Sequence, residues 1–177
     1  MLAADPAAAI TTIVSANTAL TVRLIEQRLG RAATENDFEI LTLAHAHNAQ
    51  KNTATDYVAA QLAAFQISRG LAAFFESCDV FLCPTLCAPP LRIGELNTMS
   101  EDLSHIAPIL RRYIPGTSMF NMSGQPAMSV PLAWNKAGLP LGMMFSARFG
   151  DEATLFRLAG QLEQERPWSN KIPPICA

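Results

Sequence analysis

Apolar residues recur at three- and four-residue steps through the first 78 residues, which is the spacing of amphipathic helices. Thr or Ser followed three residues later by an acidic residue adds the pattern of a helix N-terminus. Three helices follow: residues 7–28 with Gly30 as the stop, a second opened by Thr34 and Asp37, and a third opened by Thr53 and Asp56 that ends near Ser77. This part of the chain is therefore predicted to be helical.

The pattern changes at Asp79. Residues 79–83 are a short apolar run stopped by Pro84, which predicts a fully buried strand in the centre of a sheet. Two further apolar runs flank residues 135–138, which read Asn-Lys-Ala-Gly and predict a short hairpin connection. Their polar and apolar residues alternate poorly, so both faces of these strands are expected to be covered.

Helix signals also occur between and after these runs. Thr98 and Glu101 predict a capping box before a helix that Pro108 bends or ends. Residues 117–123 predict a short helix that stops at Gly124. Asp151 is predicted to cap a last helix, which carries Leu155, Leu158 and Leu162 on one side. The pattern predicts an α/β fold, a mixed sheet flanked by helices. Three strands are few for so much helix, so further strands are expected from another segment. We treat residues 1–177 as a single partial domain, with a helical segment 1–78 and a sheet region 79–177.

Composition limits the function classes. Half of the chain is hydrophobic and only 16% is charged, against about 25% in ordinary domains. Much of the surface is thus expected to face other protein, through self-association or a partner. The net charge of −2 without a basic run argues against nucleic acid and anionic membrane surfaces. No uninterrupted apolar run approaches about 20 residues, and the N-terminus lacks a basic region before an apolar one, so a cytoplasmic location without a membrane span is expected.

Cysteines and histidines do not predict a metal site. The four cysteines are Cys78, Cys83, Cys87 and Cys176, and their spacing fits neither a zinc motif nor a disulfide framework. Cys78 and Cys83 flank the first strand and are predicted to be buried thiols. No metal or other cofactor is expected.

One stretch carries a family resemblance. Residues 121–131 read Asn-Met-Ser-Gly-Gln-Pro-Ala-Met-Ser-Val-Pro, followed by Gly-Leu-Pro-Leu-Gly at 138–142 and a helix opened by Gly-Asp-Glu that closes at Pro167 and Trp168. This order resembles the C-terminal part of the amidase signature family, which are serine hydrolases of amides. The loop 86–97, with Pro89, Pro90 and Gly94, is most similar to the nylon-oligomer and aryl-amide hydrolase branches. The resemblance covers most of the chain and implies an incomplete copy of that α/β fold.

The catalytic residues of that family are not found in this sequence. The resemblance implies a serine nucleophile, a second serine in a cis peptide link and a lysine, carried by a Gly-Gly-Ser-Ser-Gly-type segment and an upstream lysine. The 177 residues contain no adjacent pair of serines. The three lysines, Lys51, Lys136 and Lys171, fall at a helix end, a hairpin turn and the tail. Ser123 lacks the glycine that a nucleophile elbow needs two residues earlier, so its hydroxyl is interpreted as closing a helix end. No catalytic residue is assigned.

The resemblance implies instead a wall of the substrate pocket. Phe120, Asn121 and Gln125 are expected nearest the pocket, with Leu86 and Cys87 at its rim. An alternative stays open, in which Asn121 and Gln125 only hold the turn together.

The sequence and the resemblance leave two main functions open, and a third with less support. In the first, the chain is the C-terminal segment of an amidase that hydrolyses a carboxamide to an acid and an amine or ammonia. It would be inactive alone and would meet its small amide substrate only when completed by an N-terminal catalytic segment. In the second, it is a non-catalytic self-associating or partner-binding module derived from an amidase. The third is a new hydrolase that uses local residues such as Ser123.

Overall fold

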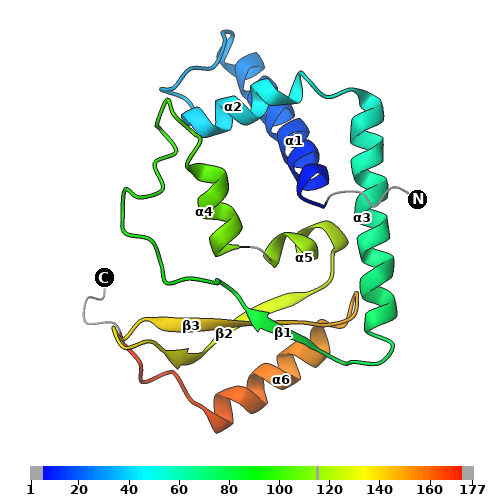
Figure 1. Ribbon diagram of the computed structural model, residues 1–177, viewed down its shortest axis with the longest axis vertical. Helices are drawn as coiled ribbons and strands as arrows, with labels where there is room; N and C mark the ends of the chain where they lie inside the picture. The colour runs from blue at the N-terminus through cyan, green and yellow to red at the C-terminus, as the bar shows by residue number, and fades with distance from the viewer. Residues whose placement is uncertain (1–5, 115, 173–177) are drawn as a thin grey trace. The chain divides into compact units, whose positions relative to one another are not determined.

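The computed structural model describes residues 6–114 and 116–172 (Figure 1). The contacts divide the chain into two compact units. The first contains residues up to Ile67 together with Pro90–Arg112, and the second contains Ser68–Pro89 and the residues from Tyr113 onward. Cys176, and the extended tail that Pro173 and Pro174 predict, lie outside the described residues.

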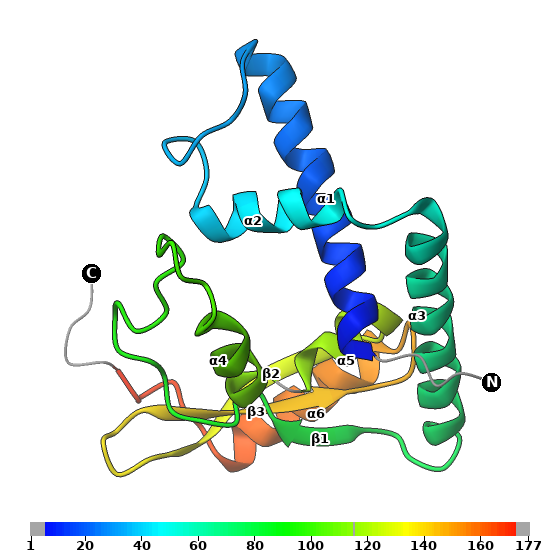
Figure 2. The ribbon, with the colours of Figure 1, turned by 45° about the horizontal axis from the view of Figure 1, so that its top comes forward.

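The first unit is helical. It contains α1 (Pro6–Leu29), α2 (Ile40–Ala49), the first part of α3 (Ala54–Phe74) and all but the last residue of α4 (Ile106–Tyr113). Helix α2 packs across α1 (Figure 2). The predicted first and third helices are confirmed, and the cap of α3 forms as expected. The Asp56 carboxylate accepts hydrogen bonds from the backbone and the hydroxyl of Thr53, each 2.7 Å long.

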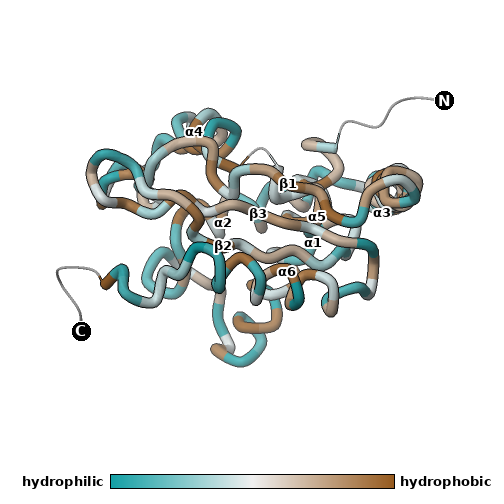
Figure 3. The backbone as a smooth tube through the Cα atoms, turned by 90° about the horizontal axis from the view of Figure 1, so that it is seen from below, coloured by the Kyte–Doolittle hydropathy of each residue, from teal (hydrophilic) through white to brown (hydrophobic). Residues whose placement is uncertain are grey.

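The long helices of this unit are unusually apolar. By length and composition α1 could cross a membrane, although polar residues interrupt its apolar positions. The same test is passed by a core helix of a soluble protein or by a signal sequence, and Ala9 and Val22 of α1 are buried against other parts of the chain. Figure 3 views α3 nearly along its axis and shows apolar residues among its turns.

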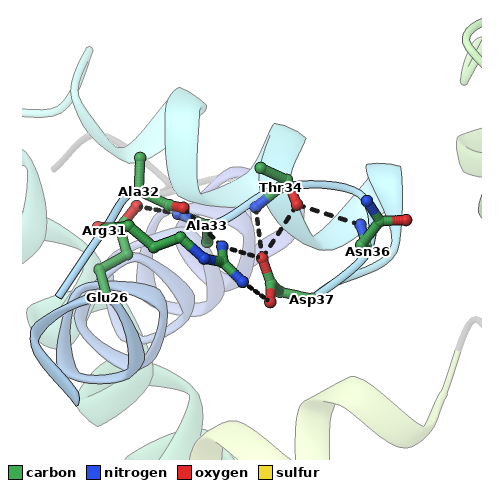
Figure 4. Close-up of polar contacts among 7 residues, drawn as sticks. All are labelled: Glu26, Arg31, Ala32, Ala33, Thr34, Asn36 and Asp37. Carbon is green, nitrogen blue, oxygen red and sulfur yellow. Dashed lines mark hydrogen bonds and ion pairs between the residues drawn. The ribbon is translucent and has the colours of Figure 1, made fainter. Parts of the chain in front are cut away.

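The predicted start of the second helix is wrong. Thr34 and Asp37 do bond to one another, through the Thr34 N–H and hydroxyl at 2.9 and 3.0 Å, but they close a turn and α2 begins only at Ile40. The guanidinium of Arg31 also binds both oxygens of Asp37, at 2.7 and 2.8 Å (Figure 4). Hydrogen bonds from Arg31 and Thr34 hold the pKa of the Asp37 carboxyl well below its usual range. The carboxylate thus organises the loop between the helices.

A second predicted capping box is also wrong. Residues 98–103 form turns and bends rather than a helix, and α4 begins at Ile106. The Thr98 carbonyl accepts a hydrogen bond from the N–H of Leu41 at 3.0 Å, and the Asn97 side chain accepts one from Met99. Pro108 lies in the first turn of α4, where the missing N–H would have no partner within the helix, so proline neither bends nor ends it.

The second unit contains a three-stranded antiparallel sheet in the order β1-β3-β2 (Figure 1). The strands are β1 (Phe81–Pro84), β2 (Ala127–Trp134) and β3 (Pro140–Ser146). The predicted hairpin is confirmed, with Asn135 and Leu139 bonded at 2.9 Å and Gly138 at a φ of 79°. The predicted central strand is not β1 but β3. Strand β1 lies at an edge of the described sheet, and Leu82 is 53% exposed because only β3 pairs with it.

Helix α6 (Glu152–Glu165) covers one face of this sheet (Figure 1). The Asp151 side chain caps it by accepting from the N–H of Thr154 at 3.3 Å, as predicted. The core between helix and sheet is built from Val130, Phe145, Ala147 and Leu155, with Leu158, Leu162 and Trp168 among the partly buried residues around it. The predicted apolar side of α6 is confirmed, and with it the α/β class.

Helix α5 (Thr117–Ser123) lies on the opposite face of the sheet, and Gly124 ends it with a φ of 77°, as predicted. Phe120 of α5 packs against Phe81 of β1, with ring centroids 5.7 Å apart. Phe81 in turn contacts Phe74 at the end of α3 at 5.8 Å. Aromatic packing therefore joins α3, β1 and α5 within the second unit.

Candidate functional site: the α5 face of the sheet

The face of the sheet opposite α6 carries the candidate site. Alternate residues of a strand share a face, so the pairings Phe81 with Ser146 and Ser129 with Met144 put these four residues on the side away from Phe145 and Val130. Phe120 of α5 contacts this side through Phe81. We call it the α5 face and define it by Phe81, Thr85, Phe120, Ser129 and Gly142.

The predicted pocket-wall residues of α5 and its C-terminal turn differ in burial. Phe120 is 4% exposed and Gln125 is 7% exposed, whereas Asn121 lies exposed on the helix surface. The side-chain oxygen Oε1 of Gln125 is buried and has no hydrogen-bond partner among the described residues. An acceptor left in this state costs about 1–3 kcal/mol relative to a paired one. Among the described residues, Gln125 Oε1 therefore lacks the hydrogen bond that would offset its burial.

The turn after α5 is held together by other residues. The N–H of Gly124 donates to the Phe120 carbonyl at 2.9 Å, and the Ser146 hydroxyl donates to the Pro126 carbonyl at 2.9 Å. The buried Ser123 hydroxyl also donates to the Phe120 carbonyl, at 3.4 Å, which is the helix-closing role predicted for it. Ser123 is thus engaged with backbone and not presented as a nucleophile.

A pair of hydroxyls lies farther along the α5 face. Thr85 Oγ1 and Ser129 Oγ are 2.5 Å apart, and the backbone N–H of Thr85 donates to the Gly142 carbonyl at 2.8 Å. A side chain at Gly142 would meet both hydroxyls, so the pair occupies the space that the glycine leaves. The sequence analysis did not single out Thr85. Its only signal was its position directly after the strand-ending Pro84.

The predicted rim residues follow β1. Leu86 is 43% exposed, and Cys87 is exposed with its N–H donating to the Tyr113 carbonyl at 3.0 Å. Cys78 and Cys83 are only partly buried, which corrects their prediction as buried thiols, because β1 lies at an edge of the described sheet. Burial, and then the nearby Cys87, raise the pKa of the Cys83 thiol. A raised pKa keeps this thiol protonated and a poor nucleophile near neutral pH.

Among residues 6–114 and 116–172 there is no group of three or more His, Cys, Asp or Glu side chains able to hold a metal ion. The α5 face carries the packed rings of Phe81 and Phe120 and the hydroxyl pair of Thr85 and Ser129. The described residues of this face do not include an activated nucleophile.

Comparison with known proteins decides the family. A family model described as Amidase matches residues 4–156 of the chain. The chain belongs to the amidase family. The amidase-family protein AmiC of Mycobacterium leprae is 37% identical to it over 150 residues, which are 82% of this chain and 31% of AmiC. The resemblance drawn from residues 121–131 and 138–142 is therefore confirmed.

Solved structures of amidases share the fold. A 6-aminohexanoate cyclic dimer hydrolase matches with a TM-score of 0.73 and 27% identity, over 89% of this chain and 34% of the hydrolase. A bacterial aryl acylamidase of the amidase signature family matches with the same TM-score of 0.73 at 19% identity, and shows the fold alone. The amidase chain described here thus spans about a third of the length of the relatives it matches.

Proposed function

We propose that this chain supplies the C-terminal part of an amidase that hydrolyses a carboxamide to a carboxylic acid and an amine or ammonia. The observation that carries the proposal is the family match over residues 4–156, in a sequence that has no adjacent serines. The serine that attacks the amide carbon would come from a further segment of the amidase fold. On its own this chain would bind the substrate or shape its pocket, but it would not cleave the amide bond.

The α5 face would form part of the substrate pocket. Phe120 and Phe81 give it an apolar wall, and Gln125 Oε1 is positioned as an acceptor without a partner. A substrate amide N–H is the complementary donor. In the reaction, the serine oxygen of the other segment replaces the amine on the acyl carbon, and water then releases the acid from the ester. The residues of this chain would hold the amide in place during both steps.

This chemistry needs no metal and no other cofactor from the chain. We further propose that the completed enzyme acts on a small amide in the cytoplasm. The small net charge of −2 supports a neutral small molecule over nucleic acid as the partner.

Complementation tests the proposal. The chain would be co-expressed with the part of AmiC that the alignment leaves uncovered, and hydrolysis of an aryl amide would be measured. We expect no hydrolysis by the chain alone and clear hydrolysis by the mixture. The third of AmiC that the chain matches serves as the positive control in the same assay. The proposal fails if that control restores hydrolysis and this chain does not, or if the chain hydrolyses the amide by itself.

Replacing Gln125 by leucine separates the two roles considered for this residue. Removing a buried acceptor that has no partner should leave the free energy of unfolding of the chain unchanged or raise it. In the complemented enzyme we expect KM for the amide to rise about tenfold, the equivalent of one lost hydrogen bond. Urea unfolding and steady-state kinetics give the two values. A variant that unfolds more easily with an unchanged KM would show that Gln125 only holds the turn.

A second candidate function is a partner-binding module without catalysis. It is favoured by the many exposed apolar side chains, such as Phe65, Phe149 and Phe156, which are 62%, 75% and 77% exposed. Tight binding to a protein partner without any gain of hydrolysis in the complementation assay would support this candidate.

A further inference from the structure

Two thiols with different surroundings lie at the end of β1. Cys83 is the third residue of the strand, and Cys87 follows it by four residues, after the strand has ended. Cys83 is partly buried, whereas Cys87 is exposed. The pocket reasoning gave Cys87 a place at a rim and gave Cys83 no role.

Both cysteines lie beside the short stretch of chain that leads from α4 to α5. A Cβ added at Gly116, the N-cap of α5, would lie 3.9 Å from Cys83 Sγ. The Cys87 N–H donates to the carbonyl of Tyr113, the last residue of α4, at 3.0 Å. Tyr113 and Gly116 are three residues apart, so at most about 11 Å of chain separates them. The two thiols are therefore neighbours in the fold as well as in the sequence.

Cys87 can move toward Cys83 without unfolding a helix or a strand. The N–H of Thr85 fixes the start of this stretch to the sheet by donating to the Gly142 carbonyl at 2.8 Å. Residues 86–89, in contrast, lie outside helices and strands, and the Leu86 side chain is exposed rather than packed in a core. Closing a bond between the two sulfur atoms would thus break the backbone hydrogen bond to Tyr113 and leave β1 paired with β3.

We propose that Cys83 and Cys87 form a reversible disulfide when the chain meets a hydroperoxide. With hydrogen peroxide, the Cys87 sulfur takes one oxygen as the O–O bond breaks, which gives a sulfenic acid and one water molecule. The Cys83 sulfur then attacks the Cys87 sulfur. The S–S bond forms as the hydroxyl leaves with the Cys83 proton, as a second water molecule. The two thiols are oxidised by two electrons, the peroxide is reduced to water, and a thiol reductant reverses the change.

The order of the two steps follows from the surroundings of the thiols. Cys87 is exposed and meets a dissolved oxidant first. Burial raises the pKa of the Cys83 thiol, so it reacts slowly with peroxide itself. Its attack on Cys87 takes place within one molecule, where a high effective concentration compensates for weak nucleophilicity.

The disulfide would also alter the start of α5. Drawing Cys87 toward Cys83 removes the hydrogen bond to Tyr113 and crowds Gly116, where α5 begins. Helix α5 carries Phe120, which the proposed function places in the wall of the substrate pocket. Oxidation would therefore lower the activity of the completed amidase. This consequence rests on the proposed function, whereas the formation of the disulfide does not.

The test treats the full 177-residue chain with hydrogen peroxide, blocks the remaining thiols with an alkylating reagent and digests the product with chymotrypsin. Cleavage after Leu86 separates the two cysteines, so mass spectrometry shows their peptides joined until a thiol reductant is added. We expect this linked pair in most of the oxidised molecules. Cys78 is the internal control, since it is also partly buried but precedes β1, and it should be recovered alkylated.

Serine variants make the test specific. Cys87→Ser should keep Cys83 free for alkylation after the same treatment, and Cys83→Ser should stop the reaction at a sulfenic acid on Cys87. Cys83→Ala repeats the second variant without placing a hydroxyl at a partly buried position. The inference is overturned if both thiols survive peroxide, or if oxidation of the parent chain stops at a sulfenic or sulfinic acid. A disulfide that joins two copies, or that includes Cys78 or Cys176, would overturn it as well.

Hydrolysis is scored separately in the complemented enzyme. We expect peroxide to lower hydrolysis severalfold and dithiothreitol to restore it, while hydrolysis by Cys87→Ser is the same before and after peroxide. A disulfide in a mixture that never hydrolyses the amide would leave this inference standing and reject the proposed function. A disulfide with undiminished hydrolysis would reject the effect on α5.

Discussion

Replacing Phe75 by alanine is expected to lower the free energy of unfolding by about 3–5 kcal/mol. Phe75 is 1% exposed and follows directly after α3. Its ring lies 5.3 Å from that of Phe74, which connects through Phe81 to Phe120 of α5. Removing the buried ring would leave a cavity beside Phe74 at the end of α3. Urea unfolding followed by circular dichroism measures the loss.

The matched control for this variant is Phe156→Ala. Phe156 is the same residue type at 77% exposure, so its truncation should change stability by no more than about 0.5 kcal/mol. A loss below about 1 kcal/mol for Phe75→Ala would contradict the aromatic packing described for the second unit. Since domains are stable by only about 5–15 kcal/mol, the expected loss would unfold a measurable share of the molecules.

Replacing Gly142 by alanine should destabilise the sheet by about 1–3 kcal/mol, because it overpacks the α5 face. A Cβ at this position would lie 2.8 Å from Ser129 Oγ and 3.0 Å from Thr85 Oγ1. To make room, the Ser129 hydroxyl must turn away and the Thr85 side chain must give way, which breaks the hydroxyl pair. Thermal unfolding with a van't Hoff analysis gives the change in stability.

Two further variants make this prediction specific. Adding Ser129→Ala to Gly142→Ala removes the nearer of the two contacted oxygens and should restore part of the lost stability. Gly160 lies inside α6 with nothing within 4 Å of an added Cβ, so Gly160→Ala should stabilise the chain by about 0.5–1 kcal/mol. An unfolding curve for Gly142→Ala that matches the parent chain would show that the hydroxyl pair is not held over the glycine.

The arrangement of the α5 face connects this packing to the proposed function. Thr85 and Ser129 connect β1 and β2 across Gly142, and Phe81 of β1 supports Phe120. A substrate held against Phe120 and Gln125 would thus rest on a sheet whose strands are fixed to one another. The roles of Phe120, Asn121, Leu86 and Cys87 as pocket wall stay predictions, and the Gln125→Leu variant tests that of Gln125.

Several elements were determined by the sequence alone because the interactions that form them are local. Thr53 and Asp56 cap α3 within one turn, and Asp151 caps α6 through Thr154. Asn135 and Gly138 close the hairpin between β2 and β3. The family was also readable, since the motif from Asn121 to Gly142 lies in one continuous stretch of sequence.

Tertiary contacts determined the other features of the fold, in which residues distant in sequence bond to one another. Arg31 binds Asp37 in the loop that stands where the second helix was predicted to begin, and Leu41 bonds to Thr98 where another helix was predicted. The edge position of β1 depends on its pairing with β3, about 60 residues later in the chain. The contact between Thr85 and Ser129 joins residues 44 positions apart. Local patterns specify caps and turns, whereas strand order and the composition of the α5 face arise only when the chain is folded.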